Sequence, residues 1–170
     1  MNITDFRMDY FSLKGKNAIV TGGNTGLGQA FSLALAKAGA NIFMPSIMPD
    51  DPSFNELIEA EGGKAVYMEA DLTKDGTAKQ IVETCVEKLG SVDILVNCAG
   101  ICLCEEVTKF GRELWDKMVS INLTAAFEMS HECAKVMIPQ NSGKIINICS
   151  LFAFLGCQLS PAYVATKHGI

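Results

Sequence analysis

A glycine-rich stretch at residues 21–28, Thr-Gly-Gly-Asn-Thr-Gly-Leu-Gly, constrains the fold more than any other part of this sequence. An apolar run at 18–20 precedes it, and apolar residues recur at helical spacing over 30–38. This order predicts a β-strand, a tight glycine turn and an α-helix. Free N–H groups at the start of such a helix attract anions, and glycines let a phosphate approach the main chain. The stretch therefore favours a nucleotide pyrophosphate, although it also suits a plain strand–helix connection.

Segments of strand and helix character alternate along the rest of the chain. Pro45 closes the second apolar run, and Ser53 with Glu56 has the pattern of a capping box that starts a helix. Helices are also expected before Gly90, over 113–138 and from 162 onward, and strands at 18–20, 40–44, 65–70, 92–96 and 144–149. The alternation predicts a single α/β domain, residues 1–170, with a Rossmann-like doubly wound parallel sheet in the order 3-2-1-4-5.

Composition narrows the classes of function. The 170 residues are 49% hydrophobic and carry a net charge of −5, with no run of Lys or Arg. We therefore expect one buried core and no nucleic-acid partner. The N-terminal segment contains Asp5, Arg7 and Asp9, so it lacks the apolar core of a signal peptide, and no apolar run reaches the roughly 20 residues that span a bilayer. We expect a cytoplasmic protein with no membrane partner.

Seven cysteines are present, and most lie in apolar segments. An odd number in such surroundings is typical of buried, reduced thiols in a cytosolic protein. A zinc site drawn from Cys102-x-Cys104 and His131-x-Cys133 lacks the usual ligand spacing. We expect no metal site.

Tyr163 and Lys167 are four residues apart, so both side chains lie on one face of a helix. A phenol in water titrates near pH ~10, and a fixed cation beside it stabilises the phenolate. Such a pair can take a proton from an alcohol or return one to a ketone. Because any surface helix can carry Tyr and Lys by chance, the pair gains its meaning from the other motifs.

Together these motifs resemble the classical short-chain dehydrogenases/reductases. The family pattern Thr-Gly-x-x-x-Gly-x-Gly falls on residues 21–28, and Asn-Asn-Ala-Gly falls on 97–100, with Cys98 in place of the second asparagine. The active-site asparagine, serine, tyrosine and lysine of the family fall on Asn122, Ser150, Tyr163 and Lys167. The resemblance covers the whole chain, and within the family it is closest to bacterial sugar-acid dehydrogenases.

The resemblance implies hydride transfer between the nicotinamide of NAD or NADP and a secondary alcohol or ketone, such as a sugar acid or polyol. Tyr163 would be the general acid/base, and Lys167 would assist it and hold the nicotinamide ribose. Ser150 would bind the substrate oxygen, and Asn122 would anchor a water in a proton relay. The implied cofactor-binding residues are Thr21, Gly22, Asn24, Thr25, Gly26, Leu27, Gly28, Ser46, Asp71, Leu72, Asn97, Ala99, Gly100, Tyr163 and Lys167.

Simpler interpretations exist for several of these residues. Asp71, matched to the family's adenine contact, also suits a cap before a helix. Asn122 suits a polar surface position on the long helix, and Ser150 suits the start of a turn after a strand. For Asn122 and Ser150, only their alignment with Tyr163 favours the functional interpretation.

The end of the second strand bears on the choice of cofactor. Ser46 stands where an acid would bind the ribose hydroxyls of NAD, and no Lys or Arg lies between Lys37 and Lys64 to pair with the 2′-phosphate of NADP. We therefore expect NAD in preference to NADP.

The family's chains are longer, so this chain is expected to be truncated after the Tyr-x-x-x-Lys motif, with its fifth strand as a sheet edge and its last helix weakly held. This leaves an alternative function, a non-catalytic polypeptide that binds a nucleotide or a partner. For a full-length form, the resemblance implies a homo-oligomer, either a dimer or a tetramer.

Overall fold

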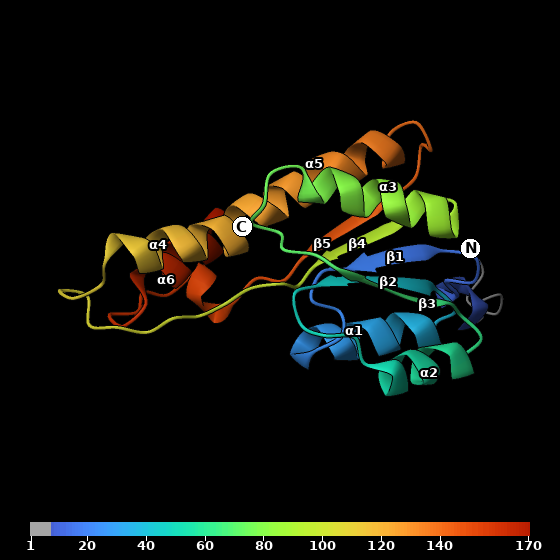
Figure 1. The fold of residues 1–170 in the computed structure, drawn as a ribbon, viewed down its shortest axis with the longest axis horizontal. Helices are drawn as coiled ribbons and strands as arrows, with labels where there is room; N and C mark the ends of the chain where they lie inside the picture. The colour runs from blue at the N-terminus through green and yellow to red at the C-terminus, as the bar shows by residue number, and fades with distance from the viewer. Residues whose placement is uncertain (1–7) are drawn as a thin grey trace, which may run out of the picture.

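The computed structural model describes residues 8–170, so Asp5 and Arg7 lie outside it. Five strands form one parallel sheet in the order β3-β2-β1-β4-β5, as the sequence predicts (Figure 1). In chain order the elements are η2 (Met8–Phe11), β1 (Asn17–Val20), α1 (Gly26–Lys37), β2 (Asn41–Ser46), α2 (Pro52–Ala60), β3 (Ala65–Glu69), α3 (Thr77–Leu89), β4 (Ile94–Asn97), α4 (Arg112–Val119), η3 (Ser120–Thr124), α5 (Ala125–Met137), β5 (Lys144–Asn147), η4 (Leu151–Ala153) and α6 (Pro161–Gly169).

Helices cover both faces of the sheet. Figure 1 shows α3 and α5 on one side and α1 and α2 on the other. Successive residues of a strand point to opposite faces, so Ile19 of β1 packs with α3 and α5, whereas Ala18 and Val20 pack with α1 and α2. Burial on both faces explains why the central strands are continuously apolar rather than alternating.

Three further helical segments, α4, η3 and α6, pack together beyond the carboxyl ends of the strands. Figure 1 shows α4 and α6 at the left. Strand β5 pairs with β4 and, within residues 8–170, with no other strand, so it forms an edge. Ile145 and Ile146 of β5 are 39% and 45% exposed. The edge position therefore leaves apolar side chains uncovered.

Strand β2 continues through Pro45 instead of ending before it. The carbonyl oxygen of Pro45 accepts a hydrogen bond from the N–H of Gly22, which lies beyond the end of β1. The paired residues of β1 and β2 extend only to Phe43, so Pro45 lies past the end of that pairing. Proline has no N–H to donate, but no β1 partner requires one at this position.

Helix α2 begins at Pro52, so the predicted capping box at Ser53 is wrong. The N-cap is Asp51, whose side chain accepts from the N–H of Phe54 at 3.3 Å. Proline at the first helical position, preceded by an aspartate, is a strong start signal. Ser53 instead donates its hydroxyl to Asp51 at 2.6 Å.

The long helix predicted over 113–138 is interrupted. Helices α4 and α5 are joined by η3, one π-helical turn that contains Asn122. A π-helical turn widens the helix by one residue and is found mostly at functional sites. The interruption has no signal in the hydrophobic pattern of the sequence.

The cysteines are less buried than predicted. All seven are free thiols, but only Cys85 and Cys133 are buried. Both lie in the core between α3 and α5, and burial raises the pKa of each thiol to about 12. The other five lie in loops around the carboxyl ends of the strands, where they are partly or fully exposed.

We expect Asp93 to make the stability of the fold depend on pH. Its carboxylate accepts from the N–H of Asn17, from the ammonium of Lys16 and from the hydroxyl of Ser91. Burial alone would raise the pKa of Asp93, but these donors outweigh burial and hold it below the usual value. Asp93→Asn should lower the free energy of unfolding at pH 7 by about 1–3 kcal/mol.

This contribution is fully present above the unfolded-state pKa of about 4 and disappears as the pH falls through the lower folded-state pKa. Urea unfolding at several pH values should therefore show the two proteins converging in acid. Asp116→Asn, at a more exposed ion pair with Arg112, serves as the control. A difference that stays constant down to pH ~2 would contradict this assignment.

Candidate cofactor and catalytic site

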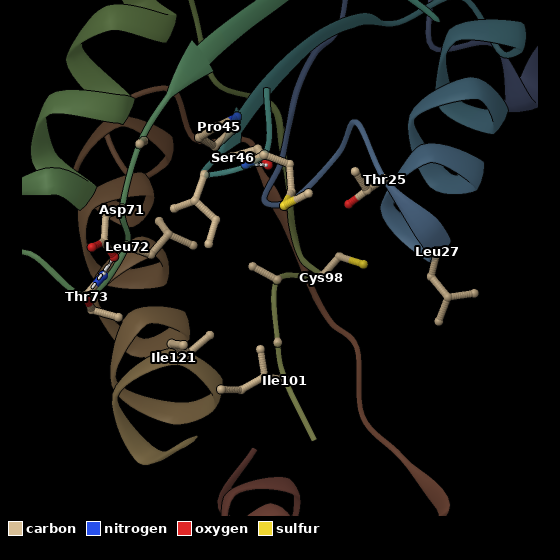
Figure 2. A pocket seen from close by; sticks show the side chains of 16 residues that line it. Thr25, Leu27, Pro45, Ser46, Asp71, Leu72, Thr73, Cys98, Ile101 and Ile121 are labelled. Atoms are coloured by element: carbon tan, nitrogen blue, oxygen red, sulfur yellow. Dashed lines mark hydrogen bonds between the residues drawn. The ribbon is translucent and has the colours of Figure 1, made fainter. Parts of the chain in front are cut away.

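A pocket of about 420 Å³ opens at the carboxyl ends of the strands, between the loops that follow β1 and β4. These loops leave the sheet at the switch point of its strand order, where doubly wound sheets bind ligands. Figure 2 shows Thr25 and Leu27 on the right of the pocket, Asp71 and Leu72 on its left, and Ile101 and Ile121 below it. The lining residues are Gly22, Thr25, Leu27, Pro45, Ser46, Ile47, Met48, Ala70, Asp71, Leu72, Thr73, Cys98, Ala99, Gly100, Ile101 and Ile121.

The glycine turn is built by close approach of its own backbone. Gly22 has φ +65°, a left-handed conformation that favours glycine, and a Cβ on Gly28 would overlap the carbonyl oxygen of Gly22. Helix α1 therefore begins directly against the end of β1. Its N-cap, Thr25, makes no side-chain capping bond, so the first-turn N–H groups are left without that partner beside the pocket.

Thr21 braces the turn against the next loop. It is 2% exposed, and its hydroxyl oxygen accepts from the N–H groups of Cys98 and Ala99, both at 3.0 Å. One side chain therefore fixes the spacing of the two loops that flank the pocket. Thr21 does not line the pocket, so its side chain acts as a support.

Two predicted cofactor residues, Asn24 and Asn97, also hold walls without lining the pocket. The amide of Asn24 donates to the carbonyl of Pro49 at 2.8 Å, which ties the glycine turn to the segment after β2. The amide of Asn97 donates to Asn147 at 2.8 Å and to Ser130 at 3.0 Å, which ties β4 to β5 and α5. Both asparagines are buried.

An apolar rim surrounds the mouth of the pocket. Leu27 and Ile47 are each 67% exposed, although both side chains are large and hydrophobic. Ser46 is buried at the end of β2, and its hydroxyl oxygen accepts from the N–H of Met48 at 3.1 Å. Exposed apolar side chains around a pocket are typical of a ligand site.

Asp71 supplies the only charged side chain among the lining residues of this pocket. Hydrogen bonds from the hydroxyl and N–H of Thr73, at 2.7 and 2.9 Å, lower the pKa of Asp71. Both bonds go to the same carboxylate oxygen, Oδ1. Asp71 therefore shapes its own turn and stays ionised in the pocket wall, and α3 begins only at Thr77.

Tyr163 and Lys167 lie side by side on α6. The ammonium of Lys167 is 5.6 Å from the centroid of the Tyr163 ring and donates to the carbonyl of Ile148 at 2.7 Å. Lys167 is only 8% exposed, and burial lowers its pKa despite the neighbouring thiols of Cys149 and Cys98. The structure thus places a buried cation against the phenol.

Ser150 is linked to the same helix through Phe152. Its hydroxyl oxygen accepts from the N–H of Phe152 at 3.2 Å at the start of η4. The Phe152 ring packs edge-on against Tyr163, with ring centroids 6.2 Å apart. Ser150 is thus both the turn residue that the simpler interpretation predicts and a neighbour of the Tyr163 segment.

Asn122 joins the pocket wall to α6. Its side chain accepts from the N–H of Ile101 and donates to the carbonyl of the same residue, both at 2.8 Å. Its amide also approaches the hydroxyl of Thr166 at 3.4 Å. These contacts occupy the side-chain amide of Asn122. The water that the family resemblance assigns to Asn122 would therefore have to be held by another group, such as the main chain of this residue.

Cys98, which replaces an asparagine of the motif, faces the pocket (Figure 2). Burial raises the pKa of its thiol, although the nearby Lys167 lowers it. The thiol is therefore neutral at pH 7 and adds an apolar surface between the glycine turn and Ile101.

A family model described as short chain dehydrogenase matches residues 16–170. The chain belongs to the short-chain dehydrogenase family.

Three similar proteins illustrate this membership. An Escherichia coli K12 protein named "Uncharacterized oxidoreductase YgcW" is 59% identical over 99% of this chain. The 2-dehydro-3-deoxy-D-gluconate 5-dehydrogenase of E. coli K12 is 40% identical over 94% of it. An Agrobacterium tumefaciens structure, provisionally assigned as a 2-deoxy-D-gluconate 3-dehydrogenase and solved with bound NADP, has a TM-score of 0.84 and is 37% identical over 94% of this chain. This short-chain dehydrogenase chain spans 65%, 63% and 63% of those three chains.

The motifs of the family divide into three groups in this structure. The residues predicted to bind the cofactor that line the pocket are Gly22, Thr25, Leu27, Ser46, Asp71, Leu72, Ala99 and Gly100. Thr21, Asn24, Gly26, Gly28 and Asn97 belong to the same loops and strands but are not among its lining residues, and Asn122, Ser150, Tyr163 and Lys167 also lie outside its lining. Sequence reasoning missed the apolar lining at Pro45, Ile47, Met48, Ile101 and Ile121, whose only signal is position after β2 and β4 and in the long helix.

Two other kinds of site receive no support from the part of the chain that the structure describes. No three His, Cys, Asp or Glu side chains between residues 8 and 170 are arranged to hold a metal ion. Each helix in that range is too short or too polar to span a bilayer.

We predict that Thr21→Val destabilises the protein although it keeps the shape of the side chain. The variant leaves two N–H groups, those of Cys98 and Ala99, without their acceptor. The expected loss in the free energy of unfolding is about 2–4 kcal/mol. Urea denaturation would measure it, with Thr108→Val on the surface as the control. Equal midpoints for the two variants would show that Thr21 is not a brace.

Proposed function

We propose that this chain is the dinucleotide-binding and proton-transferring part of an NAD(P)-dependent oxidoreductase that interconverts a secondary alcohol and a ketone. One observation carries the proposal. The side chain of Asn122 connects Ile101, in the pocket wall, to Thr166, next to Lys167 on the helix that holds Tyr163. The pocket wall and the helix that carries Tyr163 and Lys167 are thereby held to each other.

The pocket suits a dinucleotide in three respects. The uncapped N-terminus of α1 suits the diphosphate because its free N–H groups attract anions, and Gly22 lines the pocket without a side chain. The apolar rim at Leu27, Ile47 and Met48 suits flat aromatic rings. Asp71 and Leu72 would contact the adenine end. The nicotinamide, when bound, supplies the hydride chemistry.

The protein's own groups would handle the proton. The Tyr163 hydroxyl would exchange a proton with the substrate oxygen, and the Lys167 ammonium would stabilise the phenolate that results. Because Ile148 holds the ammonium in place, little reorganisation is needed when charge develops. The Ser150 hydroxyl would orient the substrate oxygen, and Asn122 would support the proton path through its main chain.

The proposed substrate class is a sugar acid or polyol. The support is that one relative is named a 2-dehydro-3-deoxy-D-gluconate 5-dehydrogenase and another is provisionally assigned to 2-deoxy-D-gluconate. Formation of a homo-oligomer and a cytoplasmic location also remain predictions. The exposed Phe127 and Ile138 on and just after α5 provide apolar surface for self-association.

We expect Tyr163→Phe to separate binding from turnover. The ring and its packing on Phe152 remain, whereas the transferable proton is lost. Turnover of sugar acids with NAD should fall by about 10²–10⁴-fold, with the dissociation constant of NADH nearly unchanged. Tyr10→Phe, on the exposed segment η2, is the matched control.

Two outcomes would contradict the enzymatic proposal. One is near-normal turnover by Tyr163→Phe. The other is NADH binding with no turnover, both in this chain and in a version extended to the length of its relatives. That second outcome would favour the alternative of a non-catalytic nucleotide-binding polypeptide.

We also propose a preference for NAD over NADP. No lining residue of the pocket carries a positive charge, so a 2′-phosphate would lack a partner near Ser46, and Asp71 is acidic. The similar Agrobacterium tumefaciens structure holds NADP, so a comparison of the two cofactors tests this preference directly. Fluorescence titration should give a dissociation constant about tenfold lower for NADH than for NADPH. Ser46→Arg should narrow or reverse the ratio, and tighter NADPH binding by the unaltered chain would overturn the proposal.

A further inference from the structure

Three of the cysteines gather outside the pocket, where two loops meet. Cys102 and Cys104 are exposed in the loop after β4, and Cys157 is partly exposed in the segment that leads into α6. Neither the fold nor the proposed hydride transfer requires thiols there. Together with their accessibility, this makes the cluster a candidate for chemistry of its own.

Hydrogen bonds hold the two loops together. The N–H of Glu105 donates to the carbonyl of Leu159 at 2.8 Å, and the hydroxyl of Ser160 donates to the carbonyl of Leu103 at 2.7 Å. The thiol of Cys102 approaches the Ser160 hydroxyl at 3.7 Å. Ser160 is buried and is the N-cap residue of α6, although its hydroxyl makes no capping bond and bonds Leu103 instead. The loop that carries Cys102 and Cys104 is therefore fixed to the start of the helix that holds Tyr163.

Cys104 interacts with both of the other thiols. The pKa of Cys104 is raised chiefly by a hydrogen bond to the Cys102 thiol and by repulsion from its thiolate, with smaller contributions from burial and from Cys157. The hydrogen bond between Glu105, next to Cys104, and Leu159, two residues after Cys157, brings the two segments side by side. Cys104 is therefore the member that lies between Cys102 and the Cys157 segment.

We propose that the Cys102–Cys104–Cys157 cluster is a site of reversible oxidation, in which Cys104 forms a disulfide with one of its two neighbours. The oxidant is a peroxide, which reaches the exposed thiols from solvent. A disulfide between Cys104 and Cys157 would covalently link the two loops, whereas one between Cys102 and Cys104 would stiffen the loop that is bonded to Ser160. Either product would lie beside the start of α6, the helix that holds Tyr163.

The reaction balances with one peroxide. The thiolate of one cysteine attacks an oxygen of hydrogen peroxide, the O–O bond breaks, and a sulfenic acid and hydroxide form. The second cysteine attacks the sulfenic sulfur, the S–S bond forms, and the S–O bond breaks as the oxygen leaves as water. Two thiols are thereby oxidised, and one peroxide is reduced to two waters.

Cys85 and Cys133 provide an internal control. They are also close enough to interact, but both are buried in the core, and burial raises each pKa to about 12. Thiolate is scarce at such a pKa, and peroxide has no access. The proposal requires these two thiols to stay reduced under conditions that oxidise the cluster.

The test is mass spectrometry of the folded 170-residue chain after brief treatment with hydrogen peroxide, followed by alkylation and peptide mapping. We expect a loss of about 2 Da that dithiothreitol reverses, with Cys104 in the bonded peptide pair. Cys104→Ser should abolish this loss, and Cys85→Ser should leave it unchanged.

Cys104 is exposed, so its replacement leaves the core intact, and circular dichroism would verify the fold of each variant. A disulfide between Cys85 and Cys133 would overturn the proposal. A product in which Cys104 is reduced, or carries only irreversible oxygen adducts, would also overturn it. A loss of about 2 Da that persists in Cys104→Ser would do the same.

Discussion

The spacing between the loops after β1 and β4 is the constraint on which the rest of the site depends. These two strands are neighbours in the sheet, but the chain leaves them toward opposite faces, which opens a crevice between the loops. The buried hydroxyl of Thr21, at the end of β1, accepts hydrogen bonds across that crevice from the main-chain N–H groups of Cys98 and Ala99, which follow β4. The close contact of Gly28 with Gly22 then sets the start of α1 directly at the edge of the crevice.

The π-helical turn at Ser120–Thr124 extends this order to the residues proposed for proton transfer. An uninterrupted helix would carry Asn122 in a different direction, whereas the wider turn lets its amide pair with the main chain of Ile101 and reach Thr166. Thr166 adjoins Lys167, whose buried ammonium is held by the carbonyl of Ile148. A chain of polar contacts thus connects the pocket wall to α6.

Much of the fold follows from the sequence, because continuous apolar strands between amphipathic helices allow few arrangements, and the strand order was predicted correctly. Local patterns failed at two places. Pro45 stays in β2 because the pairing of β1 with β2 ends before it, and Asp51, followed by Pro52, takes the cap predicted for Ser53. At the site, motifs identify positions but not how each side chain is used. Thr21, Asn24 and Asn97 turn out to support the walls, and the apolar lining at Ile47 and Ile101 depends on three-dimensional closure that no motif encodes.

The central claim is that the glycine turn and the start of α1 receive the diphosphate of a dinucleotide. Titration of the ¹⁵N-labelled chain with NADH, followed by amide resonances, tests it most directly. We expect the amide resonances of Gly22, Thr25, Leu27 and Gly28 to shift first and furthest, with smaller changes near Asp71 and Ala99. Saturable binding that leaves the amides of the turn and of the first turn of α1 unshifted would contradict it.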